Sequence, residues 1–185
     1  MALRRQWDPV PQEHYSLACG AASCLYLLKL LGVAQRGDDV PGTFKHTMTI
    51  GCVEALGSSP DKIASYLEER CAGRQPQITI QRLKTADYAG KPWIWALKFL
   101  LDYPKAPPDY VFTDNDAILR FVTIKGSMAS HFVVETRFKL PINSCQIADP
   151  AKSRMDYPTD YDSWLHVDRS GYGYEPTGLD LIITG

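Results

Sequence analysis

The strongest constraint on the fold is an apolar segment near the start of the chain. From residue 18 or 19 to residue 31 it reads ACGAASCLYLLKLL, and only Lys29 in it is clearly polar. Apolar side chains therefore occupy nearly every face of the helix that this segment predicts, and Gly32 follows where a left-handed C-cap would end it. A helix of this kind has to be surrounded by protein. We therefore expect a central, buried helix that other elements cover.

The composition is typical of a folded domain, and it does not indicate a strongly charged binding partner. The chain has 185 residues, of which 45% are hydrophobic and 22% charged, and its 20 basic and 21 acidic residues give a net charge of −1. We expect one domain over residues 1–185. The balanced charge favours neither a nucleic-acid partner nor a membrane surface. The apolar stretches 24–31 and 93–101 fall short of the roughly 20 residues that a membrane helix needs, so we expect no membrane insertion.

The first residues give an expectation for the cellular compartment, and the cysteines give one for metals and cofactors. The sequence opens MALRRQWDP, which has two arginines and no apolar core after them, so no Sec-type signal peptide is visible. We expect a cytoplasmic protein as synthesised, or one exported without such a signal. The five cysteines are an odd number and form no CxxC pair, which favours neither a zinc site nor a disulfide framework. We expect neither a metal nor a cofactor.

The rest of the chain predicts a second helix and then an antiparallel sheet. The second helix begins with Ser59 as N-cap and Pro60 at its first position, and its apolar residues recur at helical spacing up to Cys71. Strands are expected at 77–81, 118–124, 131–138, in a run that ends at 147–150, and at 179–184. A turn at 125–127 makes two of them a hairpin, and the stretch 93–101 is ambiguous between helix and strand. This order is typical of the α+β class.

Cys19 differs in its position from the other cysteines. It lies in the first turn of the buried helix, directly after an extended segment with prolines at 9 and 11. Backbone N–H groups at a helix N-terminus lack intrahelical partners, and the helix dipole favours negative charge there. A thiolate is stabilised at such a place. Gly20 beside it would let a substrate backbone approach closely.

The sequence also offers the other groups that a nucleophilic cysteine needs. His131 opens an apolar strand and is placed to act as the base. Asp149 follows eighteen residues later, where a neighbouring antiparallel strand can bring its carboxylate to the imidazole. Gln12 can donate its side-chain amide to an oxyanion, together with the Cys19 N–H.

These motifs resemble papain-like cysteine peptidases, and within them the branch that trims bacteriocin leader peptides. The resemblance rests on Gln12, on the segment CGAAS at 19–23, on HFVV at 131–134, and on IADPA at 147–151. The segment 57–63, GSSPDKI, looks like the entry to the second helix of that branch. The resemblance implies a papain-like fold whose N-terminal helix carries the cysteine and packs against a sheet carrying His and Asp.

By resemblance, Cys19 is the nucleophile, His131 the base, Asp149 the orienting acid and Gln12 an oxyanion donor. The activity that this implies is cleavage of a peptide or isopeptide bond in a peptide or protein substrate, through a thioester on Cys19. Papain-like folds also host other acyl-transfer enzymes. Two alternatives therefore stay open: a glutamine deamidase or transamidating bacterial effector or toxin with the same triad, and a catalytically silent module that binds peptides.

Other residues have plainer interpretations. His14 is placed to line a substrate cleft rather than to act as the base, and Cys24 turns away from Cys19 into the core. His46 lies in the loop-like stretch 42–46, and His166 lies beside Trp164, where a surface or packing role is expected. Trp93 and Trp95 are more typical of buried structure than of a cleft, and 171–174 is expected to be a mobile loop beside the site.

Overall fold

The computed structural model of the chain describes residues 9–12, 17–48, 57–74, 77–85, 103–107, 110, 112–113, 115–124, 130–137, 144–152, 155–166 and 173–184. Within these ranges the elements in chain order are α1 (Cys19–Leu30), α2 (Val40–Thr47), α3 (Pro60–Cys71), β1 (Thr79–Lys84), β2 (Asp116–Ile124), β3 (Ser130–Thr136), β4 (Gln146–Ala148), α5 (Tyr161–His166) and β5 (Tyr174–Thr184). The predicted α+β class is confirmed. No helix within the described ranges is both long and apolar enough to cross a membrane.

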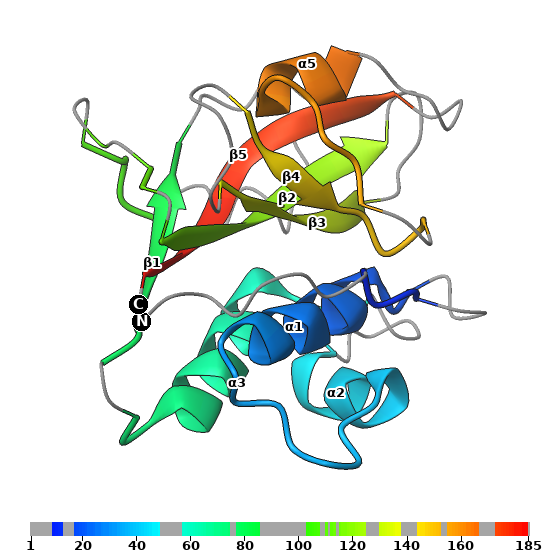
Figure 1. Ribbon diagram of the computed structural model, residues 1–185, viewed down its shortest axis with the longest axis vertical. Helices are drawn as coiled ribbons and strands as arrows, with labels where there is room; N and C mark the ends of the chain where they lie inside the picture. Colours follow the sequence, from blue (N-terminus) through cyan, green and yellow to red (C-terminus); the bar gives the residue numbers. More distant parts are fainter. Residues whose placement is uncertain are drawn as a thin grey trace.

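A five-stranded sheet separates two layers of helix. Figure 1 shows α1, α2 and α3 on one face of the sheet and α5 on the other. Side chains alternate between the two faces along each strand. Phe132 of β3 accordingly joins the larger core under α1, whereas its neighbour Val133 joins a smaller core with Trp164 of α5.

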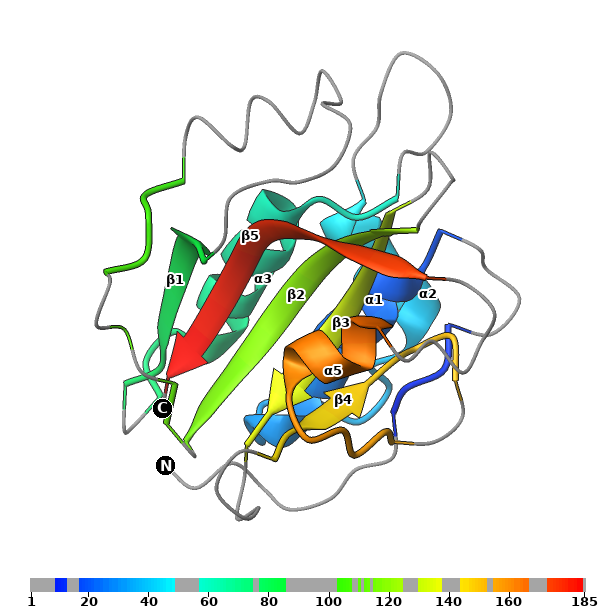
Figure 2. The ribbon, with the colours of Figure 1, turned by 90° about the horizontal axis from the view of Figure 1, so that it is seen from above.

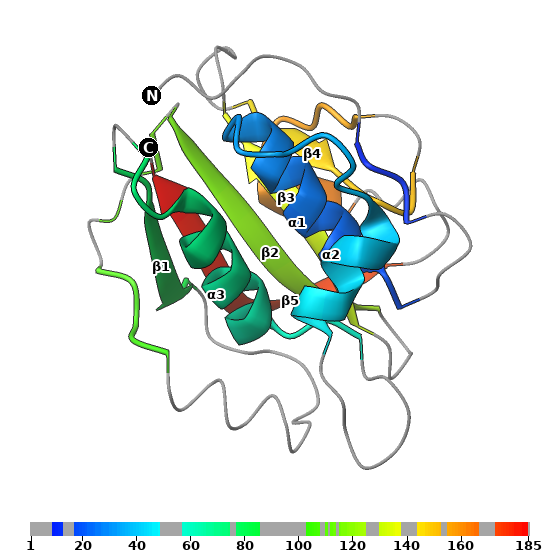
Figure 3. The same cartoon turned by 90° about the horizontal axis from the view of Figure 1, so that it is seen from below.

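The helix α1 is buried on all sides, as its sequence predicts. Every one of its residues except Lys29 is buried. It lies along the sheet beside α3, with α2 packed against it (Figure 3). Gly32 follows the helix with a φ of 66°, the left-handed conformation expected of a residue that ends a helix.

The other two helices of this layer begin with capping side chains. The Ser59 side chain accepts a hydrogen bond from the Lys62 N–H, so the predicted start of α3 is confirmed. The helix α2 was not predicted, and the expectation of a loop over residues 42–46 is wrong. Asp39 caps α2 by accepting from the Gly42 N–H at 2.7 Å. Pro41 and Gly42 are typical of turns. Here the Asp39 cap and the packing of α2 against α1 hold them in a helix.

The sheet has the order β1-β5-β2-β3-β4, and all its pairs are antiparallel. The predicted pairing of the hairpin strands is confirmed as β2 and β3, in which Phe121 pairs with Phe132, and the turn predicted at 125–127 lies outside the described residues. The expected strands at 77–81, 131–138 and 179–184 correspond to β1, β3 and β5, with different ends. The strand β5 begins five residues earlier than expected. It lies between β1 and β2, although both of these strands come well before it in the sequence.

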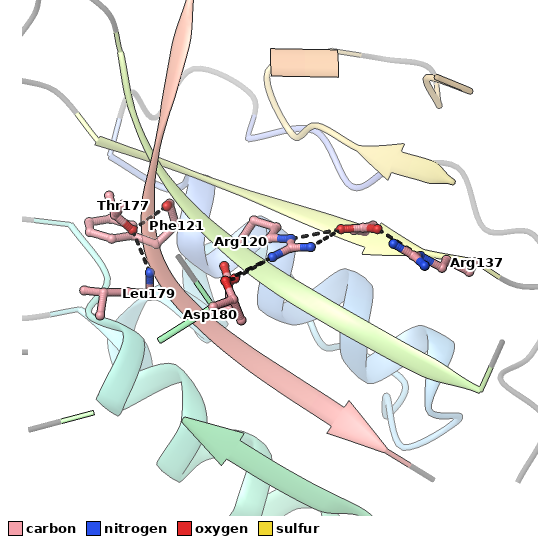
Figure 4. Close-up of polar contacts among 8 residues, drawn as sticks. Arg120, Phe121, Arg137, Thr177, Leu179 and Asp180 are labelled. Carbon is pink, nitrogen blue, oxygen red and sulfur yellow. Dashed lines mark hydrogen bonds and ion pairs between the residues drawn. The ribbon is translucent and has the colours of Figure 1, made fainter. Parts of the chain in front are cut away.

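A bulge bends β5 in its middle. Arg120 of β2 pairs with Asp180, but two residues later Val122 pairs with Pro176, so three residues of β5 face one residue of β2. The Thr177 hydroxyl fills this bulge by donating to the Phe121 carbonyl oxygen at 2.6 Å, and Gly178 has a φ of 72° (Figure 4). Bulges bend and twist a strand and re-aim its side chains. The first half of β5 therefore turns across the sheet, as Figure 2 shows.

A buried ion cluster lies on the α5 face of the sheet. The Arg120 guanidinium donates from Nε and Nη2 to Glu135 Oε2, at 2.9 and 2.6 Å, and from Nη1 to Asp180 Oδ2 at 2.5 Å (Figure 4). Its central carbon lies 4.3 Å from the centre of the Tyr161 ring. All three charged residues are buried, and burial raises the pKa of Asp180. Removal of the cation would leave Asp180 with the Thr85 hydroxyl and Glu135 with Arg137, whose Nε lies 3.3 Å from Oε1 and whose side chain is 37% exposed, so both buried carboxylates would lose their closest charged partner.

We expect Arg120→Met to lower the free energy of unfolding by about 3–5 kcal/mol, because that is the usual cost of breaking a buried ion pair from one side. Urea denaturation of the purified protein measures it. The matched control is Arg82→Met, since Arg82 pairs with Glu68 at 2.8 Å but 30% and 46% of the two side chains are exposed. An exposed pair contributes only about 0–1 kcal/mol. Equal losses in the two variants would contradict a structural role for the buried cluster.

Candidate active site

Cys19 is the first residue of α1, at an end of the helix that has no side-chain cap. The residue before it is Ala18, whose side chain makes no hydrogen bond, whereas α2 and α3 are capped by Asp39 and Ser59. The free N–H groups and the positive end of the helix dipole are therefore available to a negatively charged group at Cys19. Cys19 itself is buried, with 6% of its surface exposed.

The structure brings His131 to Cys19. His131 is the second residue of β3, and the start of β3 and the start of α1 lie at the same end of the molecule (Figure 2). Its imidazole is hydrogen-bonded to Asp149, and Cys19 lies close enough to raise the pKa of the ring. The bond to Asp149 uses Nε2, at 2.7 Å from Oδ1, which leaves Nδ1 as the ring nitrogen for the cysteine sulfur.

Asp149, which lies at the end of the strand next to β3, is the third residue of the site beside Cys19 and His131. It directly follows β4, which pairs with β3 through Val134 and Ala148. This register sets Asp149 opposite Val133, so its carboxylate reaches along the same face of the sheet to His131. Asp149 is fully buried, and its Oδ1 also accepts from the Ala151 N–H at 2.9 Å.

The electrostatics favour a charged imidazole and a charged carboxylate. Burial lowers the pKa of His131, but the hydrogen bonds with Asp149 and Cys19 and the charges of both outweigh it, so the pKa is raised to about 9. Burial raises the pKa of Asp149, but the hydrogen bond from His131 and its charge, the Ala151 N–H and Lys152 together hold it below its usual range. The pair is therefore an imidazolium beside a carboxylate at neutral pH.

Gln12 lies beside this row through its backbone. Its N–H donates to the Pro150 carbonyl oxygen at 2.9 Å, which holds it next to Asp149. Its side-chain Oε1 is buried and finds no hydrogen-bond partner among the described residues. The unpartnered atom is the amide oxygen, which accepts hydrogen bonds, so this observation does not bear on the predicted role of the side-chain N–H as a donor.

Gly20 has a different use from the expected one. A Cβ atom at this position would lie 2.4 Å from the Ser58 Cβ and 3.1 Å from a ring carbon of Phe132. The space beside Gly20 is therefore filled by the protein's own side chains. Its lack of a side chain lets Ser58 and β3 pack closely on α1, and the expectation that it admits a substrate backbone is replaced by this packing role.

The remaining candidates are either packed elsewhere or not described. Cys24 and Cys71 are buried, as expected, and burial raises the pKa of both thiols. His46 stacks on Tyr66 of α3, with ring centres 4.9 Å apart. His166 ends α5. His14, Cys52, Trp93 and Trp95 lie outside the described residues, and within the described ranges no group of three or more His, Cys, Asp or Glu is placed to hold a metal ion.

Tyr174 is a residue that the sequence did not assign to the site. It was expected in a mobile loop over 171–174, but it is the first residue of β5 and is buried. Its ring stacks on the His131 imidazole, with centres 5.6 Å apart and planes 11° apart. Its hydroxyl donates to Asp149 Oδ2 at 3.4 Å. No local pattern marks this contact, because it depends on the path of β5 across the sheet.

Comparison with known proteins identifies the fold. The chain is similar to a solved structure described as a double glycine motif protease from an AMS/PCAT transporter, in complex with the leader peptide, with a TM-score of 0.50 and 18% sequence identity. The match covers 97% of this chain and 93% of the other. No family model and no curated protein matches the sequence. The chain therefore has the papain-like α+β fold that its motifs predicted.

The raised pKa of His131 predicts a titration near pH 9, which NMR of the ring nitrogens measures. The imidazolium, and the stability that it contributes, is complete below the ordinary pKa of 6.5 and is lost as the pH rises through about 9. Asp149→Asn should lower the titration midpoint by about one pH unit or more, because burial then acts against the charged ring with one partner fewer. Asp160→Asn, at an exposed position, is the matched control. An unchanged midpoint in Asp149→Asn would refute the pairing.

Proposed function

We propose that this chain is a cysteine peptidase that cleaves peptide bonds through a thioester on Cys19. The observation that supports it is the hydrogen-bonded pair of His131 and Asp149 beside Cys19, which lies at the uncapped start of α1. A charged imidazolium beside the sulfur favours the thiolate, and the free N–H groups of the helix favour negative charge at the same place. The papain-like fold is compatible with this chemistry without requiring it.

The reaction follows from these positions. The Cys19 thiolate attacks the carbonyl carbon of the scissile bond, and the oxygen takes up the negative charge. As the C–N bond breaks, the His131 imidazolium transfers its proton to the leaving amine, and a thioester remains on Cys19. His131, now neutral, removes a proton from a water molecule that attacks the thioester. The acyl product leaves as a carboxylic acid and the thiolate–imidazolium pair is restored, with Asp149 holding the ring throughout.

The oxyanion needs hydrogen-bond donors that are in place before the reaction. The backbone N–H of Cys19 is one, because the first residue of a helix has no intrahelical acceptor. The side-chain amide of Gln12 is the second in this proposal, since the bond from its backbone N–H to the Pro150 carbonyl oxygen holds the residue beside Asp149, and an amide NH2 group carries two donors.

The substrate class that we propose is a leader-type peptide with two consecutive glycines before the cleaved bond. The similar solved protease is described as acting at a double glycine motif and binds a leader peptide. Two glycines carry no side chains, so the substrate backbone can approach a buried sulfur such as that of Cys19.

We expect the wild-type protein to split synthetic peptides that contain a double glycine, as seen by mass spectrometry of the products. Cys19→Ala and His131→Ala should each lower kcat by about 10³-fold or more, because the members of such a unit act together. Cys24→Ala, five residues further along the same helix, is the matched control and should keep its activity.

The same measurement separates the alternatives. A small increase in the mass of a glutamine-containing peptide, with the chain intact, would indicate a deamidase, and a crosslinked product would indicate a transamidase. Peptide binding that is equal in wild type and Cys19→Ala, with no turnover in either, would contradict the peptidase proposal and favour a silent binding module.

Gln12→Ala should lower kcat by about 10²-fold, the usual cost of removing one oxyanion donor, while KM changes little. Steady-state kinetics with a cleaved peptide measures both constants. Gln12→Glu keeps the size of the side chain and replaces the N–H donor by an acceptor, so it should be at least as impaired. Full activity in both variants would remove Gln12 from the proposed site.

A further inference from the structure

We propose that Lys152 is a positioning residue, whose ammonium group keeps the Asp149 carboxylate charged and in place while His131 is neutral. In the proposed reaction His131 gives up its proton as the peptide bond breaks, and the buried Asp149 then loses its charged partner. Among the described residues, Lys152 is the cation that remains paired with it. The part of this inference that concerns turnover rests on the proposed peptidase function, and the part that concerns charge rests on the contacts alone.

A tight turn after β4 brings Lys152 to Asp149. The Lys152 N–H donates to the Asp149 carbonyl oxygen at 2.9 Å, and the Ala151 N–H donates to Asp149 Oδ1, also at 2.9 Å. An Asp at the first position and a Pro at the second favour such a turn, and an Asp side chain commonly bonds the N–H two residues further on. The sequence of residues 149–152 therefore sets its first and fourth side chains close together.

The two oxygens of the Asp149 carboxylate have different partners. Oδ1 accepts from His131 Nε2 at 2.7 Å and from the Ala151 N–H. Oδ2 accepts from the Tyr174 hydroxyl at 3.4 Å and lies 3.9 Å from Lys152 Nζ. At that distance the ammonium group acts through its charge rather than through a direct hydrogen bond. Because Asp149 is fully buried, little water screens this charge.

Asp156 holds the ammonium group in place. Lys152 Nζ donates to Asp156 Oδ2 at 2.6 Å, and the same oxygen accepts from the indole N–H of Trp164 at 3.0 Å. Asp156 is fixed in turn by a bridge to β4, in which it exchanges both backbone hydrogen bonds with Ile147. Lys152 Nζ also lies 5.5 Å from the centre of the Trp164 ring. The lysine side chain is therefore held between the carboxylates of Asp149 and Asp156.

The charge of Lys152 matters most when the imidazole has lost its own. Burial raises the pKa of Asp149, and His131, the Ala151 N–H and Lys152 together hold it below its usual range. When the ring is neutral, the attraction of its charge is gone. Lys152 takes no part in the proton transfers, so its attraction stays. The other titratable groups that face the pair or Lys152 in the described part of the chain are Cys19, Tyr174 and Asp156.

The test is the NMR titration of the His131 ring in Lys152→Met, which keeps an unbranched side chain and removes its charge. We expect the midpoint to rise above that of the wild type by about half a pH unit or more, because loss of the ring's proton then leaves a buried carboxylate without a cation. A turn that merely loosened would move Asp149 away from the ring and lower the midpoint, as in Asp149→Asn. The direction of the shift therefore separates the two roles.

Two single variants serve as controls. Lys152→Arg keeps the cation and should keep the wild-type midpoint. Lys62→Met, at an exposed position of α3 on the other face of the sheet, should leave the midpoint unchanged as well (Figure 1).

A double variant isolates the effect of the lysine charge, since Lys152→Met also leaves Asp156 without its cation. Lys152→Met/Asp156→Asn removes both charges, and its midpoint should still lie above that of the wild type. A midpoint at or below the wild-type value, in the double variant or in a folded Lys152→Met, would overturn the proposal. Should the single variant fail to fold, the double variant still decides, because it balances the charges at this place.

Kinetics then connects the charge to turnover. We expect Lys152→Met to lower kcat by about threefold, the factor that corresponds to half a pH unit, because forming the neutral imidazole becomes harder by that amount. Lys152→Arg should keep kcat. A wild type that cleaves no peptide, with a raised midpoint in Lys152→Met, would sink the peptidase proposal alone. An unchanged midpoint together with an unchanged kcat would sink the role of Lys152 alone.

Discussion

The fold depends on one constraint, a helix that cannot face water on any side. Every residue of α1 except Lys29 is buried, so the helix needs the sheet on one side and α2 and α3 around the rest. A helix enclosed in this way is held rigidly by its neighbours. The residue at its first position is fixed with equal precision, which is what a nucleophile requires. Cys19 gains its geometry from the burial of α1 as a whole rather than from contacts of its own.

The two faces of the sheet differ in kind. The face under α1 is apolar, whereas the face under α5 carries the row of His131 and Asp149 and, further along, the cluster of Arg120 with Glu135 and Asp180. Charges in such a place are stable only when they are paired. Aromatic rings fill the space between the two sets, from Tyr174 through Trp164 to Tyr161, which lies on Arg120. The proposed chemistry therefore takes place in surroundings that exclude water on the sheet side.

Local patterns in the sequence predicted much of this arrangement. The contacts that depend on pairing between distant strands could not be predicted from such patterns. The helix at 19–30, the Ser59 cap and the hairpin of β2 and β3 follow from periodicity, capping and turn residues that are close in sequence. Cys19, His131 and Asp149 were found because each begins or ends such an element. Tyr174 was missed because its contact with His131, 43 positions away, depends on β5 lying between β1 and β2 and on a bulge. The helix α2 was missed because Pro41 and Gly42 favour a turn locally, and only the need to cover α1 makes them helical.

The place of β5 in the sheet has a consequence for how the protein is made. A ribosome releases α1 and the strands β1 to β4 first, yet β1 can join β2 only through β5, which is synthesised after all of them. Until residues 174–184 emerge, the nascent chain holds one unpaired strand and one incomplete sheet, and the ring that covers His131 is absent. Domains with such non-local pairing fold late and slowly. The pair of His131 and Asp149 therefore gains its neighbour Tyr174 only after β5 has joined the sheet.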